Sequence, residues 1–276
     1  MINATGNRMT QEIARQSRMA SNIAAKQAQV STGKRLQRAS DDPVASSRIT
    51  NLKRAQANDA ARAMNINMGV THTAQADGQM RTMSDLLART KVLIIAGASS
   101  GLSPADRVGI AAEINQMAED IDAMALVKSS TGEALFSNGS SLNIRFDDDT
   151  VFAPVPTRAE IFEVGSTAIS QIMRDAATAI STGNVTQTNI SLTAVDGAIN
   201  HAADMAAKIG LNAARLDRLQ DTRASRAISL SEERSALEDT DLSTAIAELN
   251  AMTLTLEAAQ AAFARINRRS LMEILS

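Results

Sequence analysis

The last forty residues, from Leu237 to Ser276, carry the pattern that most restricts how this chain can fold. Apolar side chains recur there at alternating steps of three and four residues, and no Gly or Pro interrupts them. Such a repeat makes a narrow apolar stripe that needs a partner helix, not the broad face of a helix on a globular core. We call this stripe the C-terminal seam. It consists of Leu242, Ala245, Leu249, Met252, Leu256, Ala259, Phe263 and Ile266.

The beginning of the chain offers a matching helix, with an N-terminal seam in the same four-three spacing. It consists of Met9, Ile13, Gln16, Ala20, Ile23, Gln27 and Val30. Residues 1–40 hold seven Lys and Arg against one Glu, a net charge of +6. Residues 237–276 hold three Arg against six Asp and Glu, a net charge of −3. Equal spacing and opposite charge predict a two-helix coiled coil of the two ends, the alternative being two unrelated amphipathic helices.

Composition narrows the class of protein. Of the residues 44% are hydrophobic but only 2% aromatic, which suits closely packed helical layers better than a bulky enzyme core. A net charge of −2 gives no electrostatic argument for nucleic acid binding, and the lack of Cys excludes disulfides and thiol chemistry. The first thirty residues lack the apolar stretch of a cleavable secretion signal, and the longest apolar run, near 92–96, is too short to span a membrane.

Capping residues, Gly and Pro divide the rest of the chain. They predict helices over about 5–32, 44–98, 104–128, 166–182 and 187–229, with Gly78 as a candidate kink. Residues 142–146 and 150–155 alternate like strands around Asp147-Asp148-Asp149, which predicts a hairpin in the only β-like region.

The expected fold class is therefore mainly α: long antiparallel helices and a terminal two-helix coiled coil, with a small β-hairpin insert. Three domains are expected. They are a terminal coiled coil (1–42 and 230–276), a helical bundle (43–137 and 166–229) and the hairpin insert (138–165).

No residue constellation points to catalysis, a cofactor or a metal. His72 and His201 lack a second His, or a Glu four residues away, and are expected to be exposed on helix surfaces. Asp147-Asp148-Asp149 lacks the alternating spacing of a calcium loop, so a turn is the better interpretation. The sequence predicts a protein that is not an enzyme.

A charged stretch joins the first two predicted helices. Lys34, Arg35 and Arg38 are too few for stable membrane binding, so we expect them to meet a carboxylate of this chain or of another copy. Asp41 and Asp42 precede a helix that begins near Pro43. That position stabilises them as anions and does not prepare them for proton transfer.

This stretch also resembles a known family. Residues 31–35 (Ser-Thr-Gly-Lys-Arg) and 40–45 (Ser-Asp-Asp-Pro-Val-Ala) resemble the N-terminal motif of flagellins, in the form of the hook-associated protein 3 branch. The motif residues are Gly33, Lys34, Arg35, Ser40, Asp41, Asp42 and Pro43. The ending is similar to that branch too, and the resemblance covers about 1–137 and 190–276. Residues 138–165 are much shorter than the branch's usual outer domain.

The resemblance implies an extracellular structural subunit of the bacterial flagellum, exported by the type III route without a cleaved signal. It would join hook to filament by helical polymerisation through its paired ends. The implied partners are further copies, hook-associated protein 1, flagellin and an export chaperone, with no nucleic acid or membrane. The implied assembly interface is Met9, Ile13, Ala20, Ile23, Val30, Leu242, Leu249, Met252, Leu256, Phe263 and Ile266. A divergent or minor filament flagellin and a cytosolic coiled-coil adapter are the alternatives.

Overall fold

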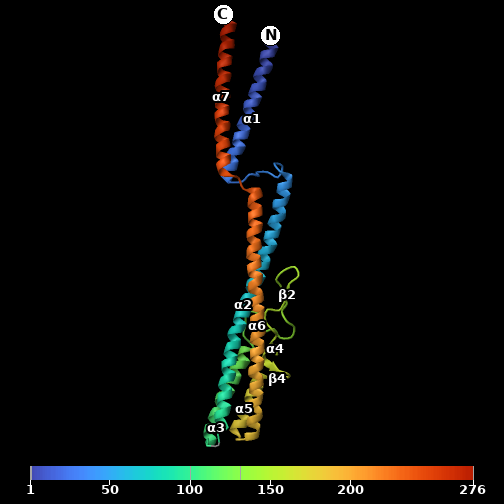
Figure 1. Ribbon diagram of the computed structural model, residues 1–276, viewed down its shortest axis with the longest axis vertical. Coiled ribbons are helices and arrows are strands. Elements are labelled where there is room, and N and C mark those ends of the chain that lie inside the picture. Colours follow the sequence, from blue (N-terminus) through green and yellow to red (C-terminus); the bar gives the residue numbers. More distant parts are fainter. Residues whose placement is uncertain (1, 100, 131, 276) are drawn as a thin grey trace. The chain divides into compact units, whose positions relative to one another are not determined.

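The computed structural model describes the backbone of residues 2–99, 101–130 and 132–275, and the side chains of the same ranges between 9 and 265 (Figure 1). The helices are α1 (Ile2–Thr32), α2 (Pro43–Gly97), α3 (Pro104–Met124), α4 (Arg158–Phe162), α5 (Ile169–Ser181), α6 (Val185–Glu238) and α7 (Leu242–Leu275). The strands are β1 (Ile144–Arg145), β2 (Val151–Phe152), β3 (Glu163–Val164) and β4 (Thr167–Ala168). The mainly α class expected from the sequence is confirmed.

The chain divides into two compact units. The terminal unit consists of Met1–Ala57 and Arg226–Ser276, and the central unit of Asn58–Ser225. Both boundaries fall inside long helices, α2 and α6, so each unit contains a part of both. The three-part division expected from the sequence stays a prediction.

In the terminal unit, α1 and α7 lie side by side and antiparallel (Figure 1). The predicted pairing of the two chain ends is therefore confirmed within one chain. The α2 segment of this unit contributes Ala45, Ile49 and Leu52 as buried apolar side chains, whereas Ala245 is the buried residue among the described side chains of α7. The unit thus has little buried apolar surface for its length.

The central unit has a continuous core between α2, α3, α5 and α6. Most of its larger side chains are unbranched or aliphatic, among them Met80, Met83, Leu87, Ile114 and Met173. Phe136 and Phe162 add one aromatic pair, with ring centroids 5.1 Å apart in an edge-to-face arrangement. This composition explains how a chain with so few aromatic residues builds a dense core, since Met and Ile fill the space between closely spaced helices.

A second, smaller core holds the predicted hairpin. Strands β1 and β2 pair antiparallel, with Ile144 opposite Phe152, as the alternation around Asp147 predicted. Phe146 is fully buried against α2 and α6. It approaches α2 at Gly69, where an added Cβ would lie 2.9 Å from the Phe146 ring, so this position requires glycine.

Several boundaries differ from the sequence-based expectation. α2 continues past Gly78 without a break, and α6 reaches Glu238 instead of ending near 229. The helix expected from 166 begins at Ile169, because a second hairpin of β3 and β4 turns at Gly165 with a φ of 66°. The expectation of a single β-like region was wrong, since strands of two residues leave no readable alternation.

Candidate assembly interface

The C-terminal seam of α7 faces α1. Ala245 is 2% exposed, and Leu249, Met252, Leu256, Ala259 and Phe263 are half-buried while the residues between them are exposed. Leu242 at the start of α7 is 46% exposed, and the side chain of Ile266 lies outside the described residues. The spacing read from the sequence thus matches the face that α7 turns toward its partner, but α1 leaves most of that face partly open.

The face that α1 turns toward α7 differs from the predicted N-terminal seam, because every second position is shifted by one residue. Its half-buried stripe is Glu12, Gln16, Met19, Ile23, Lys26 and Val30. Gln16, Ile23 and Val30 belong to the predicted seam, whereas Met9, Ile13, Ala20 and Gln27 are exposed. Two neighbouring stripes with the same spacing run along this helix. Met19 covers more apolar surface than Ala20 would, and Lys26 is long enough to reach an acid on α7.

An ion pair connects α1 and α7, as their opposite net charges predicted. The Nζ atom of Lys26 lies 2.6 Å from a carboxylate oxygen of Glu248 on α7. Both side chains are partly exposed, so this pair contributes at most about 1 kcal/mol. Lys26 also places a cation beside the apolar residues of the C-terminal seam, which makes the α1 face more polar than the face it covers.

A short polar segment, which we call the joint, lies next to this helix pair and consists of residues 33–42 and 237–241. α1 ends at Gly33, whose φ of 69° is the left-handed conformation typical of a residue following a helix. The Arg35 N–H donates to the Glu238 carbonyl oxygen at 2.8 Å, and the Thr240 N–H donates to the Gly33 oxygen at 2.9 Å. The two passages of the chain are therefore held together by their backbones.

Glu238 is the centre of the joint. It is 8% exposed, and its carboxylate lies 2.6 Å from Lys34 Nζ, 3.7 Å from Lys53 Nζ and 3.6 Å from Arg234 Nε. The hydrogen bond from Lys34 holds the pKa of Glu238 below its usual value. Burial opposes this shift, and the three nearby positive charges support it. A buried carboxylate surrounded in this way is stable as an anion, but becomes costly if its cations are removed.

The sequence missed this role of Glu238. It is the final residue of α6, and its partners Lys34 and Lys53 lie far from it in the sequence. Asp241 directly precedes α7 and accepts hydrogen bonds from Ser243 and Thr244. Led by the hydrogen bond from the Ser243 side chain, these bonds lower the pKa of Asp241 to about 2.

The remaining motif residues build the turn into α2. Asp41 accepts hydrogen bonds from the Gln37 and Arg38 N–H groups at 3.2 and 2.8 Å, and Asp42 accepts one from the Ala45 N–H at 2.9 Å. Pro43 is the first residue of α2, and Ser40 lies exposed in the turn. The carboxylates of both residues therefore accept hydrogen bonds from backbone N–H groups, as their position before a helix suggested.

The basic residues before this turn find partners inside the chain. Lys34 pairs with Glu238, and the Arg35 guanidinium donates to the Leu237 carbonyl oxygen at 2.9 Å. Arg35 also lies 3.9 Å from the Asp42 carboxylate. Of the two options open from the sequence, a carboxylate of the same chain is thus the one observed for Lys34 and Arg35.

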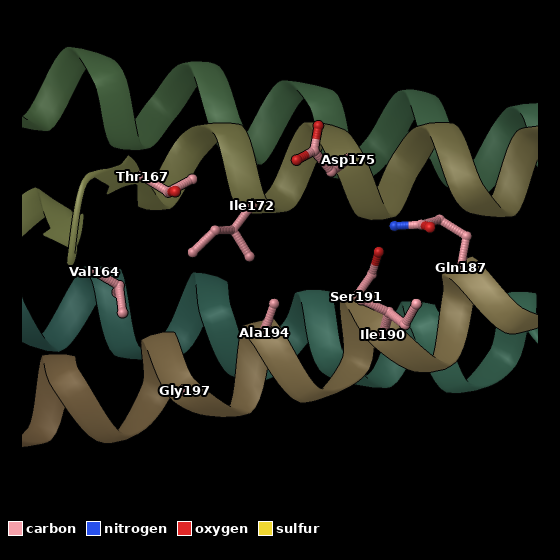
Figure 2. A pocket seen from close by; sticks show the side chains of 9 residues that line it. All are labelled: Val164, Thr167, Ile172, Asp175, Gln187, Ile190, Ser191, Ala194 and Gly197. Atoms are coloured by element: carbon pink, nitrogen blue, oxygen red, sulfur yellow. The ribbon is translucent and has the colours of Figure 1, made fainter.

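Away from these helices, the central unit has a pocket of about 350 Å³ between α5, α6 and the β3–β4 hairpin (Figure 2). Aliphatic residues such as Ile172 and Ala194 line most of it, with Asp175 at its edge and the Ser191 hydroxyl pointing inward. No histidine is among its lining residues. The described residues contain no cluster of three or more potential metal ligands.

The two histidines occupy different environments. His72 is 6% exposed beneath the insert, near Leu135 and Val155, and burial lowers its pKa. The expectation that it lies exposed was wrong, because the sequence does not show that the insert covers this part of α2. His201 is half-buried, and its Nε2 atom lies 2.8 Å from the Glu160 carbonyl oxygen.

Most of the sequence matches the helical regions of one known protein family. The bacterial flagellin N-terminal helical region matches residues 3–141, and the flagellin C-terminal helical region matches residues 192–275. The chain therefore belongs to the flagellin family. Among the residues that the structure describes, no helix has the length and apolarity to cross a membrane.

Individual relatives are distant. The chain is 23% identical over 250 residues to a flagellar filament 30.7 kDa core protein of Treponema maltophilum, covering 87% of each protein. A structure described as a flagellar hook-associated protein from Vibrio parahaemolyticus matches 72% of this chain and all of its own, with a TM-score of 0.65 and 19% identity. FlgL of Xanthomonas campestris matches 67% of this chain and 99% of its own, at TM-score 0.59 and 14% identity. At these identities the structures show a shared fold.

Proposed function

We propose that this protein is a structural subunit of the flagellum that joins hook to filament, polymerising through α1 and α7. The observation that carries the proposal is the incomplete burial of the C-terminal seam. Leu249, Leu256 and Phe263 are only half-buried against α1, which presents Glu12, Gln16 and Lys26 to α7. A seam of this kind remains open to further copies.

The energetics favour completion of the seam by other subunits. Full burial of one Leu or Phe side chain contributes about 1.5–3 kcal/mol, and Leu249, Leu256 and Phe263 have gained only part of that in the single chain. A lone helix pair is also entropically costly to order. Assembly would bury the open remainder in every copy, including Leu254, which is 68% exposed on α7. The proposed interface keeps the predicted residues of both seams, with Met9, Ile13 and Ala20 available because they are exposed.

Two observations favour the junction over the filament shaft. Residues 41–45 have the Asp-Asp-Pro-Val-Ala form that resembles the hook-associated branch. The fold is also shared with hook-associated proteins. The proposed partners are further copies, hook-associated protein 1, flagellin and an export chaperone. The proposed location is the extracellular flagellum, reached without a cleaved signal, and the role is structural rather than enzymatic.

A minor filament flagellin is the second candidate, since the Treponema relative carries the name of a filament core protein and matches along 87% of both chains. A cytosolic coiled-coil adapter is the alternative of another class.

Electron microscopy of a deletion strain separates these functions. Loss of the junction protein should leave hooks without filaments and release flagellin into the medium. Loss of a minor flagellin should leave filaments attached, whereas loss of an adapter should leave the flagellar axis complete. Filaments of normal length and number on the deletion strain would overturn the junction proposal.

A further inference from the structure

The insert carries a chemical feature that assembly does not use. Asn138 is followed by Gly139, and this is the one Asn–Gly pair in the sequence. Both residues and Ser140 are exposed, in the loop between the buried residues Phe136 and Ile144. Gly139 has a φ of 104°, and no atom lies within 4 Å of the place its Cβ would occupy. An Asn in an exposed loop before glycine is the type of asparagine most prone to chemical change.

The two groups that would react, the Gly139 N–H and the Asn138 carboxamide, are not held by hydrogen bonds in the described part of the chain. A backbone N–H held in a helix or sheet cannot approach the preceding side chain, but this one is free to do so. The loop is tied down on either side, by the hydrogen bond of 3.0 Å from the Arg158 N–H to the Ser137 oxygen and by the burial of Ile144. Asn138 can therefore react without unfolding of the central unit.

We propose that Asn138 is a site of spontaneous deamidation in the folded protein. The Gly139 nitrogen attacks the carboxamide carbon of Asn138, a new C–N bond closes a five-membered succinimide, and ammonia leaves. Water then opens the ring at either carbonyl and yields aspartate or isoaspartate. The nitrogen loses its proton to solvent as it attacks, and no oxidant, metal or enzyme is needed.

The consequence is a change in surface charge. One neutral amide becomes one carboxylate, so the net charge goes from −2 to −3. In isoaspartate the main chain also gains one methylene, which the exposed loop between Ser137 and Ile144 absorbs. The modification accumulates with time, so each copy of the protein would carry a mark of its age in the insert.

Peptide mapping tests this with an internal control. Cleavage after Lys128 and Arg145 releases residues 129–145, a peptide that contains Asn138 before Gly139 and Asn143 before Ile144. The folded protein is kept at neutral pH, sampled over days, and digested under mildly acidic conditions that stop the reaction. Conversion of Asn138 should be roughly tenfold or more faster than conversion of Asn143, because Ile144 carries a branched side chain and is buried.

Two further measurements make the result decisive. Asn138→Gln removes the short side chain that closes the five-membered ring, so the acidic drift seen by ion exchange should be lost while the circular dichroism spectrum is unchanged. An acidic drift that persists in N138Q would overturn the proposal. So would equal rates at Asn138 and Asn143, or conversion of Asn138 in urea but not in the folded protein. None of these outcomes depends on polymerisation.

Discussion

Lys34 and Glu238 are separated by 204 positions in the sequence, and the Nζ atom of one lies 2.6 Å from the Oε1 atom of the other. Glu238 is almost fully buried, and Lys53 and Arg234 complete its cationic surroundings. This contact connects the end of α1 with the end of α6, where the chain passes into α7.

Glu238→Gln should loosen the joint. The variant keeps the shape of the side chain but removes the charge, leaving Lys34, Lys53 and Arg234 without their common partner. Loss of charge-assisted hydrogen bonds of this kind costs about 1.5–3 kcal/mol. Hydrogen exchange should speed up at the Arg35 and Thr240 amides, which bond across the joint. The control is Glu257→Gln, at an exposed position of α7, whose exchange pattern should match the wild type. Equal protection in both variants would contradict the role of Glu238.

The joint should also weaken in acid. The pKa of Asp241 falls from 3.8 to about 2 through hydrogen bonds from Ser243 and Thr244. A depressed pKa means that the stabilisation is present above the unfolded value near 3.8 and is lost as pH falls through about 2. Glu238 acts in the same direction, because its pKa is also lowered. Fraying of the first turn of α7, followed by proteolysis with an acid protease, should therefore increase over this range. Asp241→Asn should reduce the pH dependence of the cleavage rate, leaving the part that Glu238 contributes.

The C-terminal seam gives the sharpest test of assembly. Leu256→Asp places a carboxylate on the half-buried face of α7, and an unpaired charge in a desolvated interface costs roughly 3–5 kcal/mol. Because every copy in a polymer repeats the defect, assembly should fail while the central unit stays folded. The expected phenotype is protein in the medium, hooks on the cells, and few or no filaments.

Glu257→Lys is the matched control, one residue along on the exposed face of the same helix, and should be nearly silent. Normal filaments with Leu256→Asp, or greater damage from Glu257→Lys, would show that this face of α7 is not the assembly element.

The insert can be tested with two glycines of the same helix. Gly69→Ala places a Cβ 2.9 Å from the Phe146 ring and 3.1 Å from Leu216, and overpacking of this kind costs about 1–3 kcal/mol. Gly78→Ala meets nothing within 4 Å and should stabilise α2 by up to about 1 kcal/mol. Thermal unfolding should therefore shift in opposite directions. A shift of the same sign in both variants would contradict the packing of Phe146 against α2.

Sequence reasoning succeeded where one chemical pattern dominates a helix. The C-terminal seam is apolar at every position, so Leu249 and Leu256 could be placed on the face that α7 turns to α1. The first helix mixes Gln, Ala and Lys, and two stripes fit it equally well. The one that includes Met19 prevails through contacts with α7 that the first helix alone does not reveal.

Long-range contacts account for the other differences between the sequence-based expectation and the structure. The residues near His72 in the sequence do not indicate that residues 135–155 cover it, and those near Glu238 do not indicate its contacts with Lys34 and Lys53. Nothing near Gly69 in the sequence shows that the Phe146 ring packs against it. In each case the deciding neighbour lies far along the chain, where local propensity and spacing carry no information.

The side-by-side placement of α1 and α7 also sets an order of events. A chain is synthesised from its N-terminus, so α1 is complete when Thr32 has been added, whereas its partner begins only at Leu242. Throughout almost the whole of synthesis the first helix has no complementary surface, and an isolated helix with a polar stripe gains little by ordering. The central unit can fold first, because the residues that contact one another within it all lie between 58 and 225. The two ends are thus the last part of the subunit able to fold, and they stay adaptable until the final residues are in place.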